Sequence, residues 1–159
     1  MDFIGIDPGK GGAIAVIHAD GTVASSVFSE EEYRDIVSRL REDAFAVVED
    51  VHAMPKQGVT SMFNFGYNKG WIMGLLYASG VQTQLVSPQR WKKSFSLDGD
   101  KQKSVDCARR LFPMASLFAT PRCKKPHDGI AEALLMAEYG RRIYNYGKIS
   151  SYPIPYPIP

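Results

Sequence analysis

The feature that most constrains the fold is a pair of short apolar runs near the N-terminus, joined by a glycine-rich turn. The first run is Phe3–Ile6, followed at once by Asp7, and the second run spans residues 13–17. Between them stand Pro8, Gly9, Gly11 and Gly12. This pattern predicts a tight β-hairpin whose two strands are central to a sheet and buried on both faces.

Asp7 is unusual because it ends a strand that is otherwise apolar. A carboxylate there is costly to desolvate unless it points out of the sheet edge and meets a cation. The glycines that follow leave room for a phosphate backbone to come close. The alternative is that Asp7 caps its own hairpin, since Asp-Pro-Gly is also a common turn sequence. The residues alone leave both interpretations open.

The rest of the hydrophobic pattern predicts an α/β chain. Further strands are expected at 22–28, 44–48 and 81–86, helices at 29–40, 60–79, 101–112 and 127–146, and a short helix or turn at 89–95. Their order predicts a mixed five-stranded sheet, an antiparallel meander extended by parallel strands and flanked by helices. Residues 1–150 are expected to form a single domain. Residues 151–159 are rich in proline, and we expect an extended or disordered tail there.

Composition narrows the possible classes. The chain has 159 residues, which is enough for one domain with a core. Two cysteines, Cys107 and Cys123, make neither a disulfide framework nor a four-cysteine zinc site. No apolar run approaches the roughly 18 residues that span a bilayer, and the N-terminus does not have the pattern of a signal peptide. We therefore expect a cytoplasmic protein that does not act at a membrane.

Positive charge is concentrated in one part of the chain. The net charge is only +2, yet ten Lys or Arg residues and only three acids fall between Arg90 and Lys125. Such a stretch is either a surface that faces phosphates or an ordinary solvated face. Composition does not decide between them.

The expected helix at 60–79 carries Gly66, Gly70 and Gly74 at four-residue intervals, which places them on one face. Each glycine costs about 1 kcal/mol in a helix interior relative to alanine. Three in register indicate a close backbone approach, either to the sheet beneath or to a second subunit.

Acidic residues recur where the predicted elements meet. A second apolar strand ends in Glu49 and Asp50, and the last helix places Asp128 and Glu132 on one face among apolar neighbours. Asp7 and these acids could converge at one sheet edge, where they would repel each other unless cations lay between them. Carboxylate oxygens suit Mg²⁺ or Mn²⁺. Two such ions would activate a water and stabilise the leaving oxygen of a phosphodiester.

Three stretches together carry a resemblance to a known family. They are GIDPGKGGAIAVI at 5–17, VVEDVHAMPKQGVTSMFNFG at 47–66 and KPHDGIAEALLMAEYGRR at 125–142. In this order, the chain to about residue 147 resembles the RuvC-type Holliday junction resolvases of the ribonuclease H-like superfamily, particularly their small phage-encoded branch. For a phage protein, the compartment would be the cytoplasm of a bacterial host.

The resemblance implies a ribonuclease H-like fold and a homodimer that makes paired incisions in four-way DNA junctions, leaving 5′-phosphate and 3′-hydroxyl ends. It also implies Mg²⁺ as cofactor, two ions per site with Mn²⁺ able to substitute, and no nucleotide cofactor. The catalytic and metal-binding residues that it implies are Asp7, Glu49, Asp128 and Glu132.

The chain departs from the family pattern at the last acid. Bacterial members typically have aspartate where this chain has Glu132, and the spacing from Asp128 is one residue longer. Which of His127, Asp128 and Glu132 bind metal is therefore open. Asp50 directly follows Glu49, so a register one residue later is also open, and His127 and Asp50 are kept as accessory candidates.

The resemblance also indicates residues that contact DNA. In the basic stretch the candidates are Lys92, Lys93, Lys101 and Lys103, and the last two resemble the family's phosphate-contacting lysines. The aromatic wedge of the bacterial members falls where this chain has His52. The candidates for distorting the junction are therefore His52, Met54 and Phe63.

Three alternative functions belong beside this one. A nuclease of the same fold could act on other branched DNA or on RNA–DNA hybrids, because the same acids serve the same chemistry. A catalytically inactive junction-binding protein is disfavoured by the presence of all four acids. A sugar-kinase or actin-like ATPase also begins with Asp-x-Gly, but it needs a second domain and a far longer chain.

Overall fold

The computed structural model describes residues 1–9, 11–40, 43–52 and 58–149. Within these ranges the elements are, in chain order, β1 (Phe3–Asp7), β2 (Ala13–Ile17), β3 (Val23–Val27), α1 (Glu30–Ser38), β4 (Phe45–Glu49), α2 (Val59–Ala78), β5 (Gln82–Val86), α3 (Pro88–Lys93), α4 (Lys101–Leu111) and α5 (Asp128–Ile149). Every element expected from the sequence is found, with ends shifted by up to three residues. Met54 and the proline-rich segment 151–159 lie outside the described residues.

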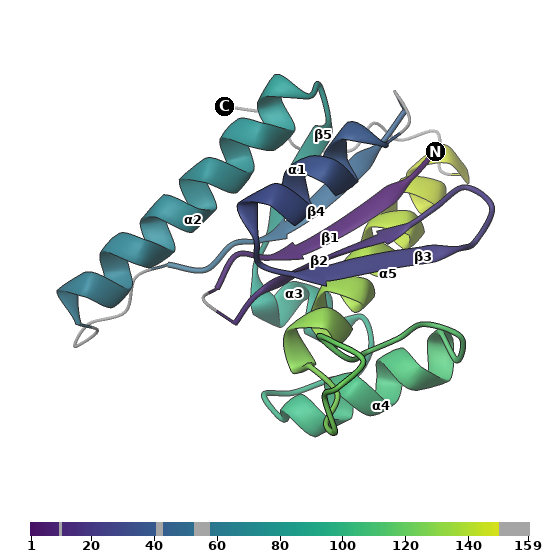
Figure 1. Ribbon diagram of the computed structural model, residues 1–159. Helices are drawn as coiled ribbons and strands as arrows, with labels where there is room; N and C mark the ends of the chain where they lie inside the picture. The colour runs from purple at the N-terminus through teal and green to yellow at the C-terminus, as the bar shows by residue number, and fades with distance from the viewer. Residues whose placement is uncertain (10, 41–42, 53–57, 150–159) are drawn as a thin grey trace.

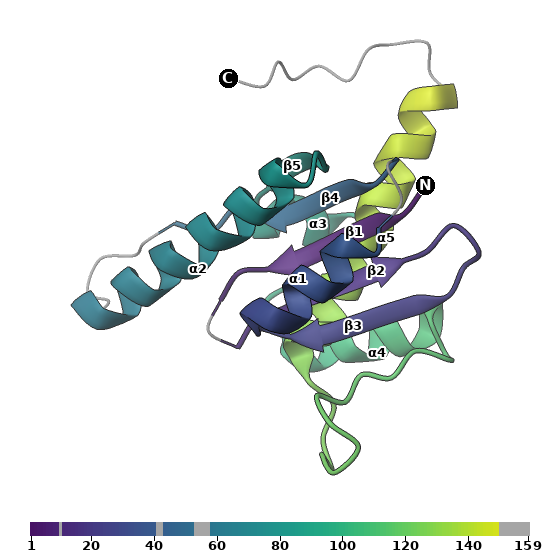
Figure 2. The same ribbon diagram turned by 45° about the horizontal axis from the view of Figure 1, so that its top comes forward.

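The strands form one mixed sheet in the order β3-β2-β1-β4-β5. Its pairs β1–β2 and β2–β3 are antiparallel, whereas β1–β4 and β4–β5 are parallel. The predicted antiparallel meander extended by parallel strands is thus confirmed. Figures 1 and 2 show α1 and α2 on one face of this sheet and α5 on the other, with α4 beside α5.

Alternate residues of the central strands enter two separate apolar cores. Phe3 and Phe45 belong to the core beneath α5. Ile4 and Ala46 belong to the core beneath α1 and α2. The hairpin strands β1 and β2 are buried on both faces up to the half-exposed Asp7, as their unbroken apolar runs predicted.

Helix α5 lies directly against β1 at Gly5. A Cβ atom added to Gly5 would stand 1.9 Å from the carbonyl oxygen of Ala133, so a residue without a side chain is required there. All residues from 129 to 140 are buried. The helix backbone therefore packs onto the strand backbone, which sets the position of its N-terminal turns above the C-terminal end of β1.

Helix α1 begins as its sequence predicted. Ser29 is the N-cap, and its hydroxyl accepts the backbone N–H of Glu32. Helix α2 begins differently, because Gly58 is its N-cap and no side chain caps it. Neither Thr60 nor Ser61 caps α2, although both residue types are common N-caps.

Helix α2 contacts the rest of the molecule through a narrow stripe. Its buried residues are Ile72 and Leu76, and its N-terminal part extends beyond the edge of the sheet in both views (Figures 1 and 2). Gly66, Gly70 and Gly74 are exposed, and an added Cβ would meet nothing within 4 Å. Gly70 and Gly74 stand about 200° around the helix from Ile72 and Leu76. The glycines therefore do not pack on the sheet, and that expectation is wrong.

No helix in the described part of the chain is both long enough and apolar enough to cross a bilayer.

Candidate active site

The register of the parallel strands brings two acids level at one sheet edge. Because β1 and β4 pair with Phe3 opposite Phe45, Asp7 and Glu49 each stand four residues further along, as the last residue of their strands. Alternation along a strand places both on the same face as Phe3 and Phe45, which is the face that α5 covers.

The start of α5 adds two more acids beside them. A Cβ added to Gly129 would stand 2.5 Å from the carbonyl oxygen of Gly11, so the first turn of α5 packs directly on the β1–β2 turn. This contact brings Asp128 and Glu132 close to Asp7, and the charges of both raise the pKa of Asp7. The four acids that the sequence singled out are therefore electrostatic neighbours at this edge.

Asp7 caps the β1–β2 turn and also belongs to this group of four acids. One of its carboxylate oxygens accepts the Gly9 N–H at 3.0 Å. Burial is the main reason that the pKa of Asp7 is raised, and the charges of Glu132 and Asp128 add to it. The Gly9 bond and the charge of Lys101 act in the opposite direction. The two interpretations of Asp7 from the sequence, a turn cap and a member of a charged cluster, both hold.

Glu49 is held by a tryptophan, Trp91, which the sequence pattern did not single out. The Trp91 indole N–H donates to Glu49 Oε1 at 2.9 Å, and the Trp91 side chain is completely buried. Burial raises the pKa of Glu49, the Trp91 bond opposes this, and the charge of Asp7 adds to it. A buried indole N–H needs an acceptor, so Trp91, just after a strand beside β4, carried a signal that the pattern analysis missed.

Glu132 is the most enclosed of the four acids, with 2% exposure. Its Oε1 forms an ion pair with Lys92 Nζ at 2.9 Å and accepts the Ser104 hydroxyl at 3.2 Å, while its Oε2 accepts from Lys101 Nζ at 2.7 Å. Lys101 Nζ also lies 3.2 Å from Asp128 Oδ2. One lysine therefore bridges the two acids of α5 and a second holds Glu132 from the other side.

These contacts determine the charge states of the bridging groups. Although partial burial opposes it, the hydrogen bond and charge of Lys101 lower the pKa of Asp128. Burial alone would lower the pKa of Lys101, but Glu132 and Asp128 outweigh it and raise that pKa. Both shifts favour the charged forms of Lys101 and Asp128.

The accessory candidates lie to either side of this group. Asp50 accepts from Lys69 Nζ of α2 at 2.8 Å, and that hydrogen bond lowers the pKa of Asp50. Asp50 thus turns toward α2, whereas Glu49 turns toward α5. His127 Nδ1 accepts the backbone N–H of Ile130 at 3.4 Å, which makes His127 a cap of the first turn of α5.

The candidate DNA-contacting residues fall into two groups. Lys92 is largely buried against Glu132, and Lys101 is half-exposed above the acids. The others lie at the surface, namely His52, Phe63, Lys93 and Lys103. Of these, Lys103 is paired with Asp98, and His52 lies 3.4 Å from Asp50.

The residues present suit a hard divalent cation in their chemistry. Within the described ranges, no group of three or more His, Cys, Asp or Glu side chains is arranged to hold a metal ion. The donors are nevertheless carboxylate oxygens, which Mg²⁺ and Mn²⁺ prefer. Burial raises the pKa values of Asp7 and Glu49, and neighbouring carboxylates add to this, namely Glu132 and Asp128 for Asp7, and Asp7 and Glu132 for Glu49. The site thus holds more negative charge than its lysines neutralise.

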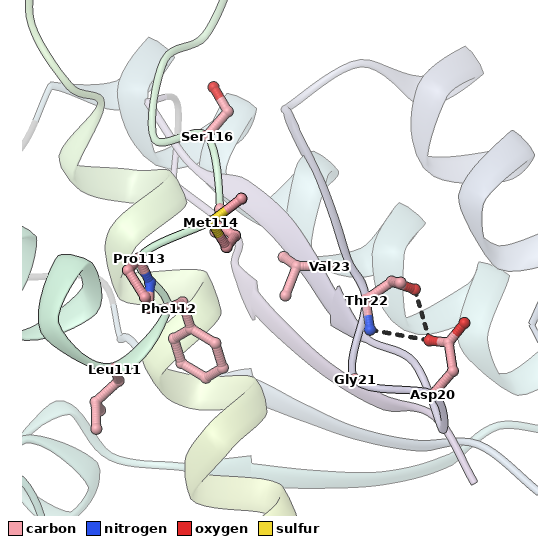
Figure 3. Close-up of a pocket in the computed structure, with 10 residues that line it drawn as sticks. Asp20, Gly21, Thr22, Val23, Leu111, Phe112, Pro113, Met114 and Ser116 are labelled. Atoms are coloured by element: carbon pink, nitrogen blue, oxygen red, sulfur yellow. Dashed lines mark hydrogen bonds between the residues drawn. The ribbon is translucent and has the colours of Figure 1, made fainter.

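A separate pocket of about 690 Å³ lies between the β2–β3 turn and the segment that follows α4 (Figure 3). The β2–β3 turn follows Ile17, which pairs with Phe3, so the pocket is at the opposite end of the sheet from Asp7. Asp20 is the one acid among its lining residues. It accepts from the N–H and hydroxyl of Thr22 at 2.9 and 2.7 Å (Figure 3), so this pocket does not have paired carboxylates.

Comparison with known proteins gives a clear result for the fold. No protein-family model matches the sequence, and a search of curated proteins finds no matching relative. Thermus thermophilus RuvC in complex with a Holliday junction substrate is 15% identical, with 92% of this chain and 97% of that chain covered and a TM-score of 0.63. A second structure of Thermus thermophilus RuvC is 18% identical, with 89% and 96% covered and a TM-score of 0.56.

The yeast mitochondrial Holliday junction resolvase Ydc2 is also similar, at 14% identity, with 92% of this chain and 81% of that chain covered and a TM-score of 0.50. These similarities extend over nearly all of the chain. The chain therefore has the ribonuclease H-like fold of the RuvC-type Holliday junction resolvases.

Proposed function

We propose that the protein is a divalent-metal-dependent endonuclease that resolves four-way DNA junctions by paired phosphodiester hydrolysis. The observation that carries the proposal is the meeting of four acids at one sheet edge, namely Asp7, Glu49, Asp128 and Glu132. Its second support is the fold, which is shared with resolvases, one of them in complex with a Holliday junction.

In the proposed mechanism, these four acids would supply the oxygen ligands of one or two Mg²⁺ or Mn²⁺ ions. When bound, such ions activate a water for attack on phosphorus and stabilise the leaving oxygen. The chain's own contribution is positioning. Strands β1 and β4 keep Asp7 and Glu49 level, Trp91 fixes Glu49, and Lys92 with Ser104 fixes Glu132.

DNA would be bound by the basic surface next to this edge. Lys93 and Lys103 are exposed on α3 and α4, and both helices belong to the face that carries the four acids. Lysines so placed would contact phosphates and set the register of the strand over the acids, without reading sequence. Phe63 is 71% exposed near the start of α2 and is our candidate for stacking at the junction crossover.

A homodimer would place two such sites across a two-fold axis, as the symmetry of a junction requires. The outer side of α2 suits a second copy, because three glycines there leave room for a backbone to approach. Large apolar side chains on α2 are also exposed, namely Val59, Met62, Phe63, Tyr67 and Tyr77. Sedimentation analysis should show a dimer, and Gly70→Arg should convert it to a monomer with an unchanged circular dichroism spectrum.

The test of activity uses purified protein, Mg²⁺ and five labelled substrates: a four-way junction, a three-way junction, a flap, a linear duplex and an RNA–DNA hybrid. We expect symmetric nicks in the four-way junction with wild-type protein and none with Asp7→Asn. The variant should still bind the junction. Cleavage of the hybrid alone would assign the protein to the ribonucleases instead. Tight junction binding without cleavage in Mg²⁺ or Mn²⁺ would contradict the enzymatic proposal.

A further inference from the structure

Lys101 occupies the space between the two acids of α5. Its ammonium nitrogen lies 2.7 Å from Glu132 Oε2 and 3.2 Å from Asp128 Oδ2. It also acts on Asp7, whose pKa its charge lowers. A single positive charge thus serves three of the four acids. This is the arrangement that a bound cation would have to replace.

Lys92 holds the same glutamate in a different way. It lies 2.9 Å from Glu132 Oε1, and its side chain is 15% exposed, whereas the side chain of Lys101 is 54% exposed. Ser104 also donates to Oε1. Oε1 of Glu132 therefore has two enclosed partners, the Lys92 ammonium and the Ser104 hydroxyl, whereas Oε2 meets the solvent-accessible Lys101 ammonium.

The position of Lys101 in the chain favours movement. It is the first residue of α4, directly after the N-cap Asp100, so the helix does not depend on its side chain. An exposed lysine side chain keeps much of its rotamer freedom, and a half-exposed ion pair contributes little to stability. The Lys101 side chain would therefore leave the two acids readily once another cation binds them.

We propose that the Lys101 ammonium is a built-in counter-ion of Asp128 and Glu132, and that a divalent cation binds these acids by displacing it. This rests on the proposed function, because it assumes the same four acids as metal ligands. It explains why the four acids are close enough to interact electrostatically, and why a lysine ammonium lies between the two acids of α5. The displaced ammonium then faces solvent on the basic side of the site, where it can meet a DNA phosphate.

The first test measures Mn²⁺ binding by isothermal titration calorimetry on the full chain without DNA. Lys101→Met removes the competing charge, so we expect Mn²⁺ to bind about tenfold more tightly than to wild type. Lys103→Met is the matched control, since Lys103 lies two residues away on α4 and pairs with Asp98 instead. Its Mn²⁺ affinity should stay within about twofold of wild type.

The second test uses only wild-type protein, so it does not depend on how the variant folds. Each lysine is labelled with an amine-reactive reagent and quantified by mass spectrometry, with and without Mg²⁺. We expect Mg²⁺ to increase labelling of Lys101 and to leave Lys103 unchanged.

The outcomes separate this inference from the function on which it rests. If wild type binds Mn²⁺ and Lys101→Met binds it no more tightly, the counter-ion role is wrong while the metal site stands. If Mg²⁺ leaves the labelling of Lys101 unchanged although it binds, displacement is wrong. If neither protein binds a divalent ion, both the inference and the metal-dependent function fail.

Discussion

Helices α5 and α2 are the two long helices of the molecule, on opposite faces of the same sheet, and both carry glycines within their length. In α5, two glycines are contact points: Gly129 meets the β1–β2 turn, and Gly140 meets Val47 and Phe45. In α2, Gly66, Gly70 and Gly74 meet nothing within 4 Å. Glycine therefore allows close backbone packing in α5, whereas in α2 it lies on an exposed surface.

The difference shows which contacts position the proposed site. Helix α5 reaches the backbone of β1 because Gly5 has no side chain, and this brings Glu132 to the edge where Asp7 stands. Helix α2 buries only Ile72 and Leu76 fully in the core, with Trp71, Met73 and Leu75 packed partly buried beside them, and does not contribute an acid to the site. The α5 face is thus complete within one chain, whereas the α2 face is the one that a second copy could complete.

The largest predicted effect breaks the contact between α5 and β1. In Gly5→Ala the new Cβ would clash with the carbonyl oxygen of Ala133 at 1.9 Å and with the backbone nitrogen of Ala137 at 2.4 Å. Neither backbone atom can move aside without shifting the helix. We expect a loss of about 4 kcal/mol or more in the free energy of unfolding, measured by urea denaturation. Near-normal stability would contradict the close packing of α5 on β1.

The next effect concerns the tryptophans of the two faces. Trp91→Phe leaves Glu49 without its indole donor in a buried position, so we expect a loss of about 1–3 kcal/mol in stability. Junction cleavage should fall with little change in junction affinity, because Glu49 is mispositioned rather than removed. Trp71→Phe on the α2 side is the control, since Trp71 packs edge-on against Phe28. Equal losses of cleavage in both variants would rule out a positioning role for Trp91.

A smaller effect, the change in stability on replacing glycine with alanine, should have opposite signs in α2 and α5. Gly70→Ala adds a methyl group in open space and removes the helix penalty of glycine, so the isolated chain should gain about 1 kcal/mol. Gly140→Ala instead places the Cβ 3.0 Å from Val47 Cγ2, and we expect it to destabilise. Thermal unfolding at low protein concentration measures both. If Gly70→Ala also weakens self-association, the outer side of α2 is the dimer surface.

The sequence predicted what local patterns determine. Apolar runs located the strands, and the Asp128 and Glu132 spacing placed both acids near the start of α5. The partner of the glycines in α2 was not predictable, because a four-residue spacing shows that they share a face and does not show what that face meets. Trp91 and Lys101 were missed as partners of Glu49 and of the α5 acids for the same reason. The contacts of Trp91 with Glu49 and of Lys101 with Glu132 join residues 42 and 31 positions apart, and only the packing of α3, α4 and α5 brings them together.

The smallest predicted effect tests whether the ionised Asp7 carboxylate, enclosed on the α5 face, lowers the stability of the folded protein. Burial and the charges of Glu132 and Asp128 raise the pKa of Asp7 in the folded protein, so its ionised form favours unfolding. Asp7→Asn keeps an oxygen for the Gly9 N–H and removes the charge. In chelator at pH 7–8, the variant should therefore unfold at a higher temperature than wild type.

The pH dependence gives this prediction its sign check. Below the unfolded-state pKa of about 4, Asp7 is protonated in both states, so the advantage of Asp7→Asn should vanish there and grow as the pH rises through the folded-state pKa. Asp20→Asn is the opposite control, because hydrogen bonds from Thr22 lower the pKa of Asp20. Its loss of stability should be present at neutral pH and disappear in acid. If Asp7→Asn were instead less stable than wild type at neutral pH, attraction by Lys101 would outweigh burial and repulsion. The acids at this edge would then be fully balanced without a metal.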